Sequence, residues 1–375
     1  MGADCIVVGG GINGLLTALE LRTAGLAVQV LDKGPVGREA SWAGGGILSP
    51  LRPWRQPEPV TRLASWSQTR WPALCGELRE LTGVDPQWWR CGLLVLGAEP
   101  GEQARAEAWA GRAEVKLEGL AEARSCGRAA CLARDRAAEV ALWLPEVAQV
   151  RNPRLVRALR TAALKKGVAL SEGEAAERIE VAEGRVAAVR TSSGRRPCGC
   201  VVLAAGAWTP GLLPSGVRRP DVEPVRGQMV LWRGRPGLLE TIVLAGERYL
   251  IPRRDGRILC GSTVERVGFD RAATPEARQA LTGAGVALCP ALAALPVEAH
   301  WAGLRPAAPA GIPYVCVHPE AEGLFLNVGQ YRNGVVLAPA SARLTADLVL
   351  GREPVLPPGP YAFDAPRDAG QHLNS

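Results

Sequence analysis

The sequence predicts an α/β protein, and three stretches of its 375 residues carry that prediction. Residues 4–33 read as a strand, a helix and a second strand, with closely spaced glycines at the first turn. Residues 200–205 form a very apolar run, which is typical of a buried central strand of a parallel sheet. Residues 222–300 contain short strand-like runs separated by Gly, Arg and Asp turns, which predict an antiparallel sheet. Because single cores stop growing at around 250 to 300 residues, we expect two domains.

The N-terminal unit has the glycine spacing of a dinucleotide-binding Rossmann fold. Gly9 permits the tight turn out of the strand, Gly11 lets the backbone approach a pyrophosphate, and Gly14 lets the helix pack close to the sheet. The pyrophosphate then lies at the positive end of the helix dipole. Asp32 ends the second strand, where an acid accepts hydrogen bonds from the adenosine ribose. This unit alone leaves NAD and FAD open.

Composition and charge narrow the class of protein. Hydrophobic residues make up 47% of the chain and charged residues 22%, as in ordinary globular proteins. No apolar run reaches the roughly 18 residues of a membrane span, and the N-terminus lacks the pattern of a signal peptide. The formal charge of +7 is spread along the chain, which favours a solvated surface that attracts anionic substrates over a nucleic-acid site. We therefore expect a cytoplasmic enzyme with no nucleic-acid or membrane partner.

Cysteine and histidine give no sign of a metal site. The ten cysteines are scattered, and neither Cys198-x-Cys200 nor the Cys126–Cys131 pair has the spacing of zinc ligands. The three histidines, His300, His318 and His372, form no metal-binding pattern. We expect the cysteines to be reduced and mostly buried.

A second glycine cluster follows the nucleotide unit at Gly44, Gly45 and Gly46. Only glycine removes the Cβ barrier, so the cluster suggests backbone that passes close to something flat or large. The bulky and apolar residues on either side, 41–42 and 47–48, argue against a merely flexible loop.

Periodicity and turn residues predict the remaining elements. Helices are expected at residues 60–82, 152–166 and 275–288, and the first of them is expected to bury Leu63, Trp66, Trp71, Leu74 and Leu78 in the core. Strands are expected at 92–96 and 168–170, and a hairpin at 177–181 and 186–191 around Glu183-Gly184. Residues 101–139 are expected to be helical and exposed.

The C-terminal part repeats the strand–turn–helix pattern. Residues 323–329 read as a strand, 330–334 as a tight connection, and 335–350 as a long helix that ends at Gly351. This arrangement places another helix N-terminus beside the sheet, where it can face a bound cofactor.

Taken together, these stretches resemble the flavin-dependent amine and amino-acid oxidases, a family that includes D-amino-acid oxidase, sarcosine oxidase and, most similar, the glycine oxidases of thiamine biosynthesis. The residues that carry the resemblance are GREASWAGGGILSP (37–50), VVLAAGAW (201–208), RGQMV (226–230), YLIPRRDGRILCGSTVE (249–265), WAGLRP (301–306) and GQYRNGVVLAP (329–339). The resemblance implies a Rossmann-like FAD-binding domain of residues 1–48, 141–217 and 303–372. It also implies a discontinuous α+β substrate domain, built on an antiparallel sheet, of residues 49–140 and 218–302.

The resemblance also implies which residues bind FAD and substrate. The FAD-binding set comprises Gly9, Gly11, Ile12, Asn13 and Gly14 at the helix start, Asp32 and Lys33 at the ribose, Glu39, Ala40, Gly44, Gly45 and Gly46 near the flavin, Ala176 beside the adenine, and Gln330, Tyr331, Arg332, Asn333, Gly334, Val335 and Val336 under the ring. The substrate carboxylate is expected between Arg305 and Arg332, with help from the Tyr249 hydroxyl.

Elementary chemistry agrees with this carboxylate clamp. A guanidinium group binds a carboxylate through two parallel hydrogen bonds, which are strong in a water-poor site. From spacing alone, Arg305 is as compatible with a surface position, and Tyr249 with a core or edge position. The joint occurrence of Tyr249, Arg305 and Arg332 favours the clamp.

The reaction implied by the resemblance is oxidative deamination of glycine and other small primary or secondary amines, such as sarcosine, other N-substituted glycines and D-alanine. With the carboxylate fixed, the Cα–H of a neutral amine faces flavin N5, and hydride transfer gives an imine that hydrolyses to glyoxylate and ammonia. Oxygen then reoxidises the flavin and yields hydrogen peroxide. A homotetramer and transfer of the imine to a thiazole synthase are further implications.

Two positions depart from the family pattern, and three other functions stay open. Many glycine oxidases have His at the position of Gln330, and some have a bulkier residue at the position of Gly46, so substrates larger than glycine stay open. The other functions are the flavin subunit of an amine dehydrogenase, such as a cyanide-forming glycine dehydrogenase, a flavin domain that acts on modified tRNA, and a non-catalytic dinucleotide sensor.

Overall fold

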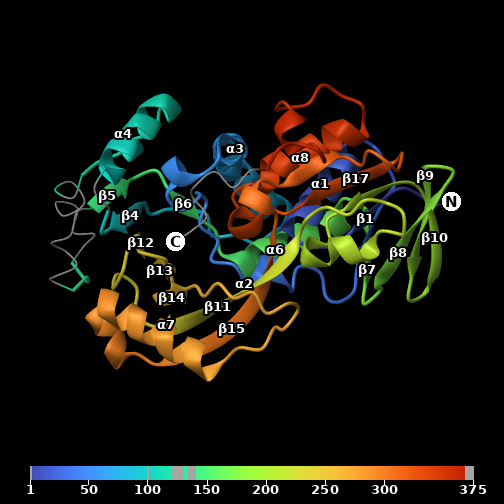
Figure 1. Ribbon diagram of the computed structural model, residues 1–375. Helices are drawn as coiled ribbons and strands as arrows, with labels where there is room; N and C mark the ends of the chain where they lie inside the picture. The colour runs from blue at the N-terminus through green and yellow to red at the C-terminus, as the bar shows by residue number, and fades with distance from the viewer. Residues whose placement is uncertain (1, 99–100, 120, 122–129, 134–140, 368–375) are drawn as a thin grey trace.

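The computed structural model describes residues 2–98, 101–119, 121, 130–133 and 141–367. Two sheets organise the chain, one at the right of Figure 1 and one at its lower left. The strand order of the first sheet is β16-β17-β10-β1-β2-β7. Its strands are β1 (Ala3–Val8), β2 (Val28–Asp32), β7 (Ala169–Glu172), β10 (Gly194–Leu203), β16 (Tyr314–Val317) and β17 (Leu324–Val328). Along this order all neighbours pair in parallel except β16, which runs antiparallel to β17 at the edge. The two further strands of this sheet, Ala176–Ala182 and Arg185–Thr191, form a hairpin that joins β10 by antiparallel pairing.

The alternation of side chains along β1 explains how the first sheet is covered. Cys5 and Val7 pack on one face in a core shared with α1 (Ile12–Thr23), α6 (Asn152–Lys165) and α8 (Ala338–Val349). Ile6 and Val8 point to the other face and pack against the hairpin of β8 (Ala176–Ala182) and β9 (Arg185–Thr191). Val202 of β10 packs on the first face and Val201 and Leu203 on the second, so the end of this central strand is apolar on both sides, which confirms the interpretation of residues 200–205 as a buried strand.

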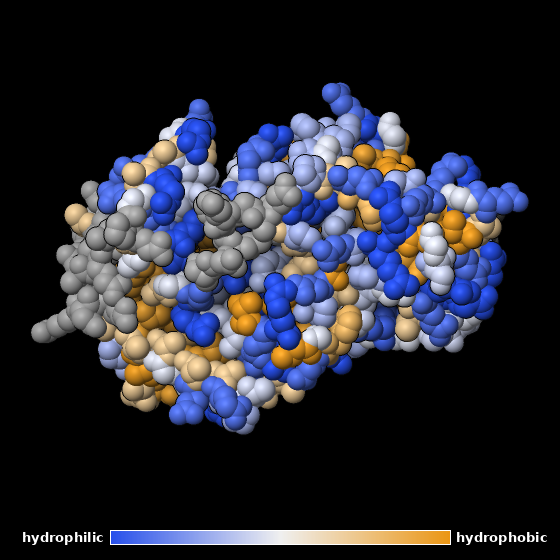
Figure 2. Space-filling model, viewed as in Figure 1, coloured by the Kyte–Doolittle hydropathy of each residue, from blue (hydrophilic) through white to orange (hydrophobic). Residues whose placement is uncertain are grey.

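The outer surface of the β8–β10 region is charged. Arg190 and Arg195 both pair with Glu180, at 2.8 and 2.7 Å. Figure 2 shows mostly hydrophilic residues over this end of the molecule. The hairpin therefore covers the sheet with its apolar face and presents its polar face to water.

The turn from β1 into α1 depends on two glycines. Gly9 has a φ of 105°, and a Cβ atom there would lie 2.4 Å from the Ala204 carbonyl oxygen. At Gly14 a Cβ atom would lie 1.9 Å from the Gly9 carbonyl oxygen. The first glycine thus permits the turn and the second lets the helix pack against the strand, as the spacing indicates.

The second sheet has the strand order β15-β11-β14-β13-β12-β4-β5. Its strands are β4 (Leu93–Leu96), β5 (Ala141–Leu144), β11 (Glu223–Arg233), β12 (Ile242–Ala245), β13 (Arg248–Pro252), β14 (Arg257–Gly261) and β15 (Val297–Ala307). The predicted antiparallel pairing is confirmed from β11 to β14, but β4 joins β12 in parallel. This parallel pair joins segments about 150 residues apart.

Helix α7 (Pro275–Leu288) covers one face of the second sheet. Its Leu281 and Leu288 are buried in the same cluster as Trp232 of β11. The other face contributes Met229 and Leu244 to a core next to α4 (Glu102–Ala113). Helix α3 (Glu58–Thr82) contacts both α6 and α8 and lies between the two sheets in Figure 1.

Most of the other elements match the sequence-based predictions. Helices α3, α6 and α7 and the hairpin β8–β9 are confirmed within a few residues, and of the predicted core of α3 only Trp66 is half-buried. Helix α8 begins at Ala338 instead of residue 335, and Pro339 lies in its first turn. The short elements are α2 (Ala40–Ala43), β3 (Trp89–Arg90) and β6 (Ala148–Gln149).

The prediction of an exposed helical region at 101–139 is partly wrong. Helix α4 ends at Ala113, and Glu118 instead pairs through its backbone with Trp143, with two bonds of 2.8 Å. Glu102 and Ala106 on α4 are buried, so this helix is not wholly exposed. Residues 120, 122–129 and 134–139 of the predicted region lie outside the described residues.

The domain boundaries stay a prediction. The boundary expected between residues 302 and 303 falls inside β15, and residues 134–140 and 368–372 lie outside the described chain.

Among the described residues, no helix combines the length and apolar character that crossing a membrane requires.

The glycine contact leads to a stability prediction. Gly14→Ala forces the backbone of α1 or β1 to move, so we expect the free energy of unfolding to fall by about 3 kcal/mol. Gly76→Ala is the matched control, because Gly76 lies inside α3 with no atom within 4 Å of the added Cβ, and we expect a gain of about 0.5–1 kcal/mol. Urea unfolding of both variants checks this; equal stability of the two would contradict the packing argument.

Candidate active site

A cavity of about 1340 Å³ lies where the two sheets meet. Its wall includes the carboxyl ends of β1 and β2, the start of α1, and residues of β13, β15 and the turn after β17. Open α/β sheets bind ligands outside the carboxyl ends of their strands. The volume exceeds the roughly 300–1,000 Å³ of ordinary small-molecule sites, as a dinucleotide together with a substrate requires.

The start of α1 forms one end of this cavity. Gly11 at the N-cap gives no side-chain cap to the helix among the described residues, and the Ile12 amide donates to Ser41 Oγ at 2.9 Å. Asn13 donates through Nδ2 to the Gly334 carbonyl at 3.2 Å, while its buried Oδ1 has no hydrogen-bond partner in the described chain. The first turn of a helix carries unpaired N–H groups that attract anions. This end therefore fits a pyrophosphate.

Asp32 lies at the end of β2 beside this helix start. Its Oδ2 accepts from the Gly10 amide at 2.9 Å, and its Oδ1 accepts from the Gly34 amide at 3.0 Å. Burial raises the pKa of Asp32, although the two backbone hydrogen bonds oppose the shift. The carboxylate is thus held in one orientation at the cavity wall, as ribose binding requires.

Lys33 and Trp208 form the next part of the wall. The Lys33 Nζ lies 3.2 Å from the Trp208 ring centroid and 3.5 Å from Glu39 Oε1. Burial lowers the pKa of Lys33, and the Glu39 carboxylate opposes this shift. Arg271 also binds Glu39, at 2.7 Å. These contacts hold the Lys33 and Glu39 side chains in place in the cavity wall, which also includes Ala176.

The glycine cluster lines the middle of the cavity, but protein atoms explain its glycines. A Cβ atom at Gly46, which has a φ of 78°, would lie 2.1 Å from the Val150 carbonyl oxygen, and one at Gly45 would lie 2.6 Å from Ile251. Arg253 donates through Nη2 to the Gly45 carbonyl at 2.8 Å, and burial lowers the pKa of this arginine to about 10. Neighbouring parts of the chain therefore require glycine at Gly45 and Gly46, and a contact of the cluster with the flavin stays a prediction.

Arg305 on β15 and Tyr249 on β13 also line the cavity. Arg305 donates to Ser262 Oγ at 2.6 Å and to the Thr263 carbonyl at 3.1 Å. A Cβ atom at Gly227 would lie 2.1 Å from Arg305 Nη1, so this glycine on the neighbouring β11 makes room for the guanidinium. Arg305 is thus oriented by the sheet and is not a surface residue.

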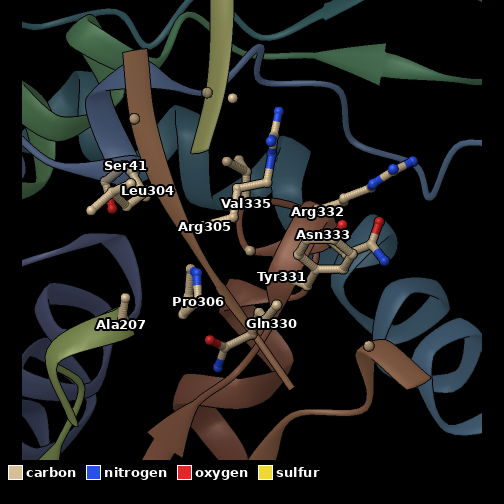
Figure 3. Close-up of a pocket in the computed structure, with 18 of the residues that line it drawn as sticks. Ser41, Ala207, Leu304, Arg305, Pro306, Gln330, Tyr331, Arg332, Asn333 and Val335 are labelled. Atoms are coloured by element: carbon tan, nitrogen blue, oxygen red, sulfur yellow. The ribbon is translucent and has the colours of Figure 1, made fainter. Parts of the chain in front are cut away.

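Arg332 enters the cavity wall from the turn after β17. It donates through Nη1 to Glu247 Oε2 at 2.8 Å. Burial alone would lower the pKa of Arg332, but Tyr331 and Glu247 outweigh it and raise the pKa. Gln330 in the same turn donates to Asn327 Oδ1 at 2.7 Å. In Figure 3 the side chains of Arg305 and Arg332 extend away from Gln330.

The structure brings nearly all the sequence-predicted site residues to this cavity. Two of the predicted residues, Gly14 and Val336, do not line the cavity. Gly14 packs α1 against β1, and Val336 is buried in a core cluster. Lining the cavity does not test the individual contacts with a cofactor or substrate, so those contacts stay predictions.

Sequence reasoning missed the loop 51–56, which also lines the cavity. Arg52 in this loop is 9% exposed and has a φ of 52°, and it lies 3.5 Å from Glu102 and 3.7 Å from Glu247. Glu102, only 1% exposed, also accepts from Arg55 at 2.7 Å and from Trp54 at 2.9 Å. The Arg and Trp residues so soon after the glycine cluster were the available signal.

The fold and the cavity define a dinucleotide-dependent enzyme, and comparisons with known proteins specify its class. Residues 4–348 match the family of FAD dependent oxidoreductases that includes D-amino-acid oxidase. The chain belongs to this family, and its cofactor is FAD. The helix start of α1, the Asn13 Oδ1 that has no partner among the described residues, and the oriented Asp32 fit this cofactor.

Several relatives are similar over nearly the whole chain. The glycine oxidase of Pseudomonas aeruginosa is 48% identical over 370 residues, which is 96% of this chain and 99% of that protein. The glycine oxidase of Pseudomonas putida is 46% identical over 96% of this chain and 98% of its own length. The crystal structure of glycine oxidase from Geobacillus kaustophilus has a TM-score of 0.90 at 31% identity and covers 98% of this chain and 99% of that one.

The buried carboxylate of Glu102 leads to a second prediction. Glu102→Gln leaves Arg52 and Arg55 without this charge partner, so we expect the free energy of unfolding to fall by about 3 kcal/mol. Glu107→Gln on the exposed side of α4 is the control, with an expected change within about 0.5 kcal/mol. Chemical denaturation measures both variants. A loss no larger than that of the control would show that Glu102 does not anchor the loop.

Proposed function

We propose that the protein oxidises glycine and small N-substituted glycines. For glycine, the substrate reacts with O2 and water to give glyoxylate, ammonia and hydrogen peroxide. One observation carries the proposal: Arg305, Arg332 and Tyr249 line the same cavity as the start of α1, which we propose to bind the nucleotide. The similarity to the glycine oxidases of Pseudomonas supports it.

The proposed contacts with FAD follow the order of residues along the cavity. The start of α1 binds the pyrophosphate, Asp32 and Lys33 lie at the ribose, Ala176 lies at the adenine, and residues 39–46 and 330–336 hold the flavin. FAD, when bound, supplies the hydride acceptor. The chain's own task is to bind the amino acid, orient its Cα–H and exclude water.

The proposed carboxylate site uses donors that remain after the internal contacts. A guanidinium group has five N–H donors, and Glu247 accepts from Nη1 of Arg332. The carboxylate therefore binds the remaining donors of Arg332, those of Arg305 and the Tyr249 hydroxyl. Met229 and Leu244 give the same region an apolar wall that suits a small amine or its N-methyl group.

No imidazole is available at this site in the described chain. Neither His300 nor His318 lines the cavity, and His318 Nε2 lies 2.9 Å from the Arg218 carbonyl. We infer that the substrate amine reacts in its neutral form without a histidine base. This inference agrees with the position of Gln330, whose amide does not change charge near neutral pH.

The proposal extends to partners. Bifunctional protein ThiO/ThiG of Synechocystis is 34% identical to this chain over 362 residues, and the chain covers 52% of that protein's length. This similarity supports a role in thiamine thiazole biosynthesis, in which the imine is transferred to a thiazole synthase. A homotetramer and a cytoplasmic location are proposed on the family resemblance.

Flavin absorbance and peroxide yield test the function. Glycine or sarcosine added without oxygen should bleach the visible flavin band of the FAD-loaded protein, because the substrate reduces the bound flavin. In air, we expect one peroxide for each glyoxylate. Bleaching without peroxide would indicate an amine dehydrogenase, and no bleaching would indicate a non-catalytic dinucleotide sensor.

Substitution of the arginines tests the carboxylate site. We expect Arg332→Ala to lower kcat/KM, because the substrate carboxylate loses a charged donor. The expected loss of transition-state stabilisation is about 2–5 kcal/mol. Arg305→Ala should mainly raise KM. The flavin-to-protein absorbance ratio should stay constant in both variants.

Arg185→Ala is the control for the loss of an arginine. Arg185 pairs with Glu322 at the exposed β8–β9 turn, and its side chain is 64% exposed. Its kinetics should match those of the wild type. An unchanged KM and kcat in Arg332→Ala would exclude the proposed carboxylate site.

A further inference from the structure

Three ionic side chains form a cluster in the wall of the cavity, and one of them, Arg332, also belongs to the proposed carboxylate site. Glu247 accepts from Arg332 Nη1 at 2.8 Å and lies 3.7 Å from Arg52 Nη1. All three side chains line the same cavity as Arg305 and Tyr249. We call Arg52, Glu247 and Arg332 the Glu247 cluster.

The positions of the two arginines do not depend on Glu247 alone. Arg52 also donates through Nη2 to the Gly246 carbonyl at 2.9 Å, and its Nε lies 3.5 Å from the buried Glu102. Arg332 lies against the Tyr331 ring, with 5.4 Å between its Cζ and the ring centroid. Removal of the Glu247 carboxylate therefore leaves two oriented guanidinium groups at the cavity wall.

Glu247 itself comes from a tight turn. Gly246, which has a φ of 53°, and Glu247 connect β12 to β13. The carboxylate of Glu247 is 43% exposed, whereas the side chain of Arg52 is 10% exposed. The chain thus places one of its own carboxylates between two arginines, at a position that a carboxylate of a ligand could otherwise occupy.

We propose that Glu247 is a specificity-determining residue that fills an anion subsite formed by Arg52 and Arg332. This inference rests on the proposed function, in which the first carboxylate of the substrate binds Arg305 and Arg332. A substrate with a second carboxylate meets the negative charge of Glu247, and juxtaposed like charges are costly in a partly buried site. The cavity therefore selects amino acids that carry a single carboxylate.

Two charge-removing variants and one control test this selection. Glu247→Gln keeps the shape of the side chain and removes its charge, and Glu247→Ala also opens the space. Glu322→Gln removes an exposed carboxylate that pairs with Arg185, and neither of these two residues lines the cavity. Because a glutamate 43% exposed contributes little to stability, we expect all three variants to fold.

The kinetic measurement compares glycine with iminodiacetate, an N-substituted glycine with a second carboxylate. In both Glu247 variants we expect the ratio of kcat/KM for iminodiacetate to that for glycine to rise about tenfold or more. In Glu322→Gln the ratio should change by less than about threefold. An unchanged ratio in both Glu247 variants would overturn the proposal and identify the contact as an ordinary surface ion pair.

A binding measurement separates this proposal from the proposed function. Malonate and acetate, which lack an amine, are titrated into the FAD-loaded protein, and the flavin absorbance gives their Kd. We expect Glu247→Gln to strengthen malonate binding about tenfold and to change acetate binding much less. Equal changes for the two anions would overturn the subsite. Failure of the wild type to oxidise glycine would instead reject the proposed function, while the comparison of malonate with acetate would still decide the role of Glu247.

Discussion

The contact between Gly14 and the Gly9 carbonyl is the constraint on which the cofactor end of the molecule depends. A Cβ atom at Gly14 would lie 1.9 Å from that oxygen, so only glycine lets α1 start so close to β1. The contact places the N–H groups of the first helical turn at the carboxyl end of the sheet. Asp32 is fixed to the same corner by the Gly10 amide. These two contacts position the groups that we propose to bind the pyrophosphate and the ribose.

The opposite end of the cavity depends on alternating charges. Arg55, Glu102, Arg52, Glu247 and Arg332 follow one another at 2.7 to 3.7 Å and join α4, the loop 51–56, the β12–β13 turn and the turn after β17. The buried Glu102 anchors this chain of ion pairs, since a charge with 1% exposure requires partners. The exposed Glu247 lies next to Arg332 and so connects the anchor to the proposed substrate site.

Much of the fold could be predicted from the sequence, because its elements have strong local signals. The glycine spacing at residues 9–14, the apolar run at 200–205 and the period of α3 each specify a structure within a short window. Pairings between distant segments have no such signal. The parallel pair of β4 with β12 joins residues about 150 positions apart, and helix α4 has the composition of a surface helix although Glu102 is buried.

For the candidate site, the sequence indicated which residues line the cavity but not how they contact one another. The family resemblance indicated Tyr249, Arg305 and Arg332, and all three line one cavity. It could not indicate that Arg332 already binds Glu247, because the two residues are 85 positions apart and neither has a distinctive local pattern. Similarly, the glycines at 44–46 suggested a bound group, but their sequence could not indicate that Asn152, Ile251 and Val150 also lie close to them.

A crystal structure of the FAD-loaded protein with acetate tests the account most directly, because acetate has the carboxylate of glycine without its amine. The account predicts the pyrophosphate at the start of α1 and the acetate carboxylate bound by both Arg305 and Arg332, with Glu247 still at Arg332 Nη1. Acetate bound elsewhere in the cavity, or a pyrophosphate away from residues 11–13, would contradict it.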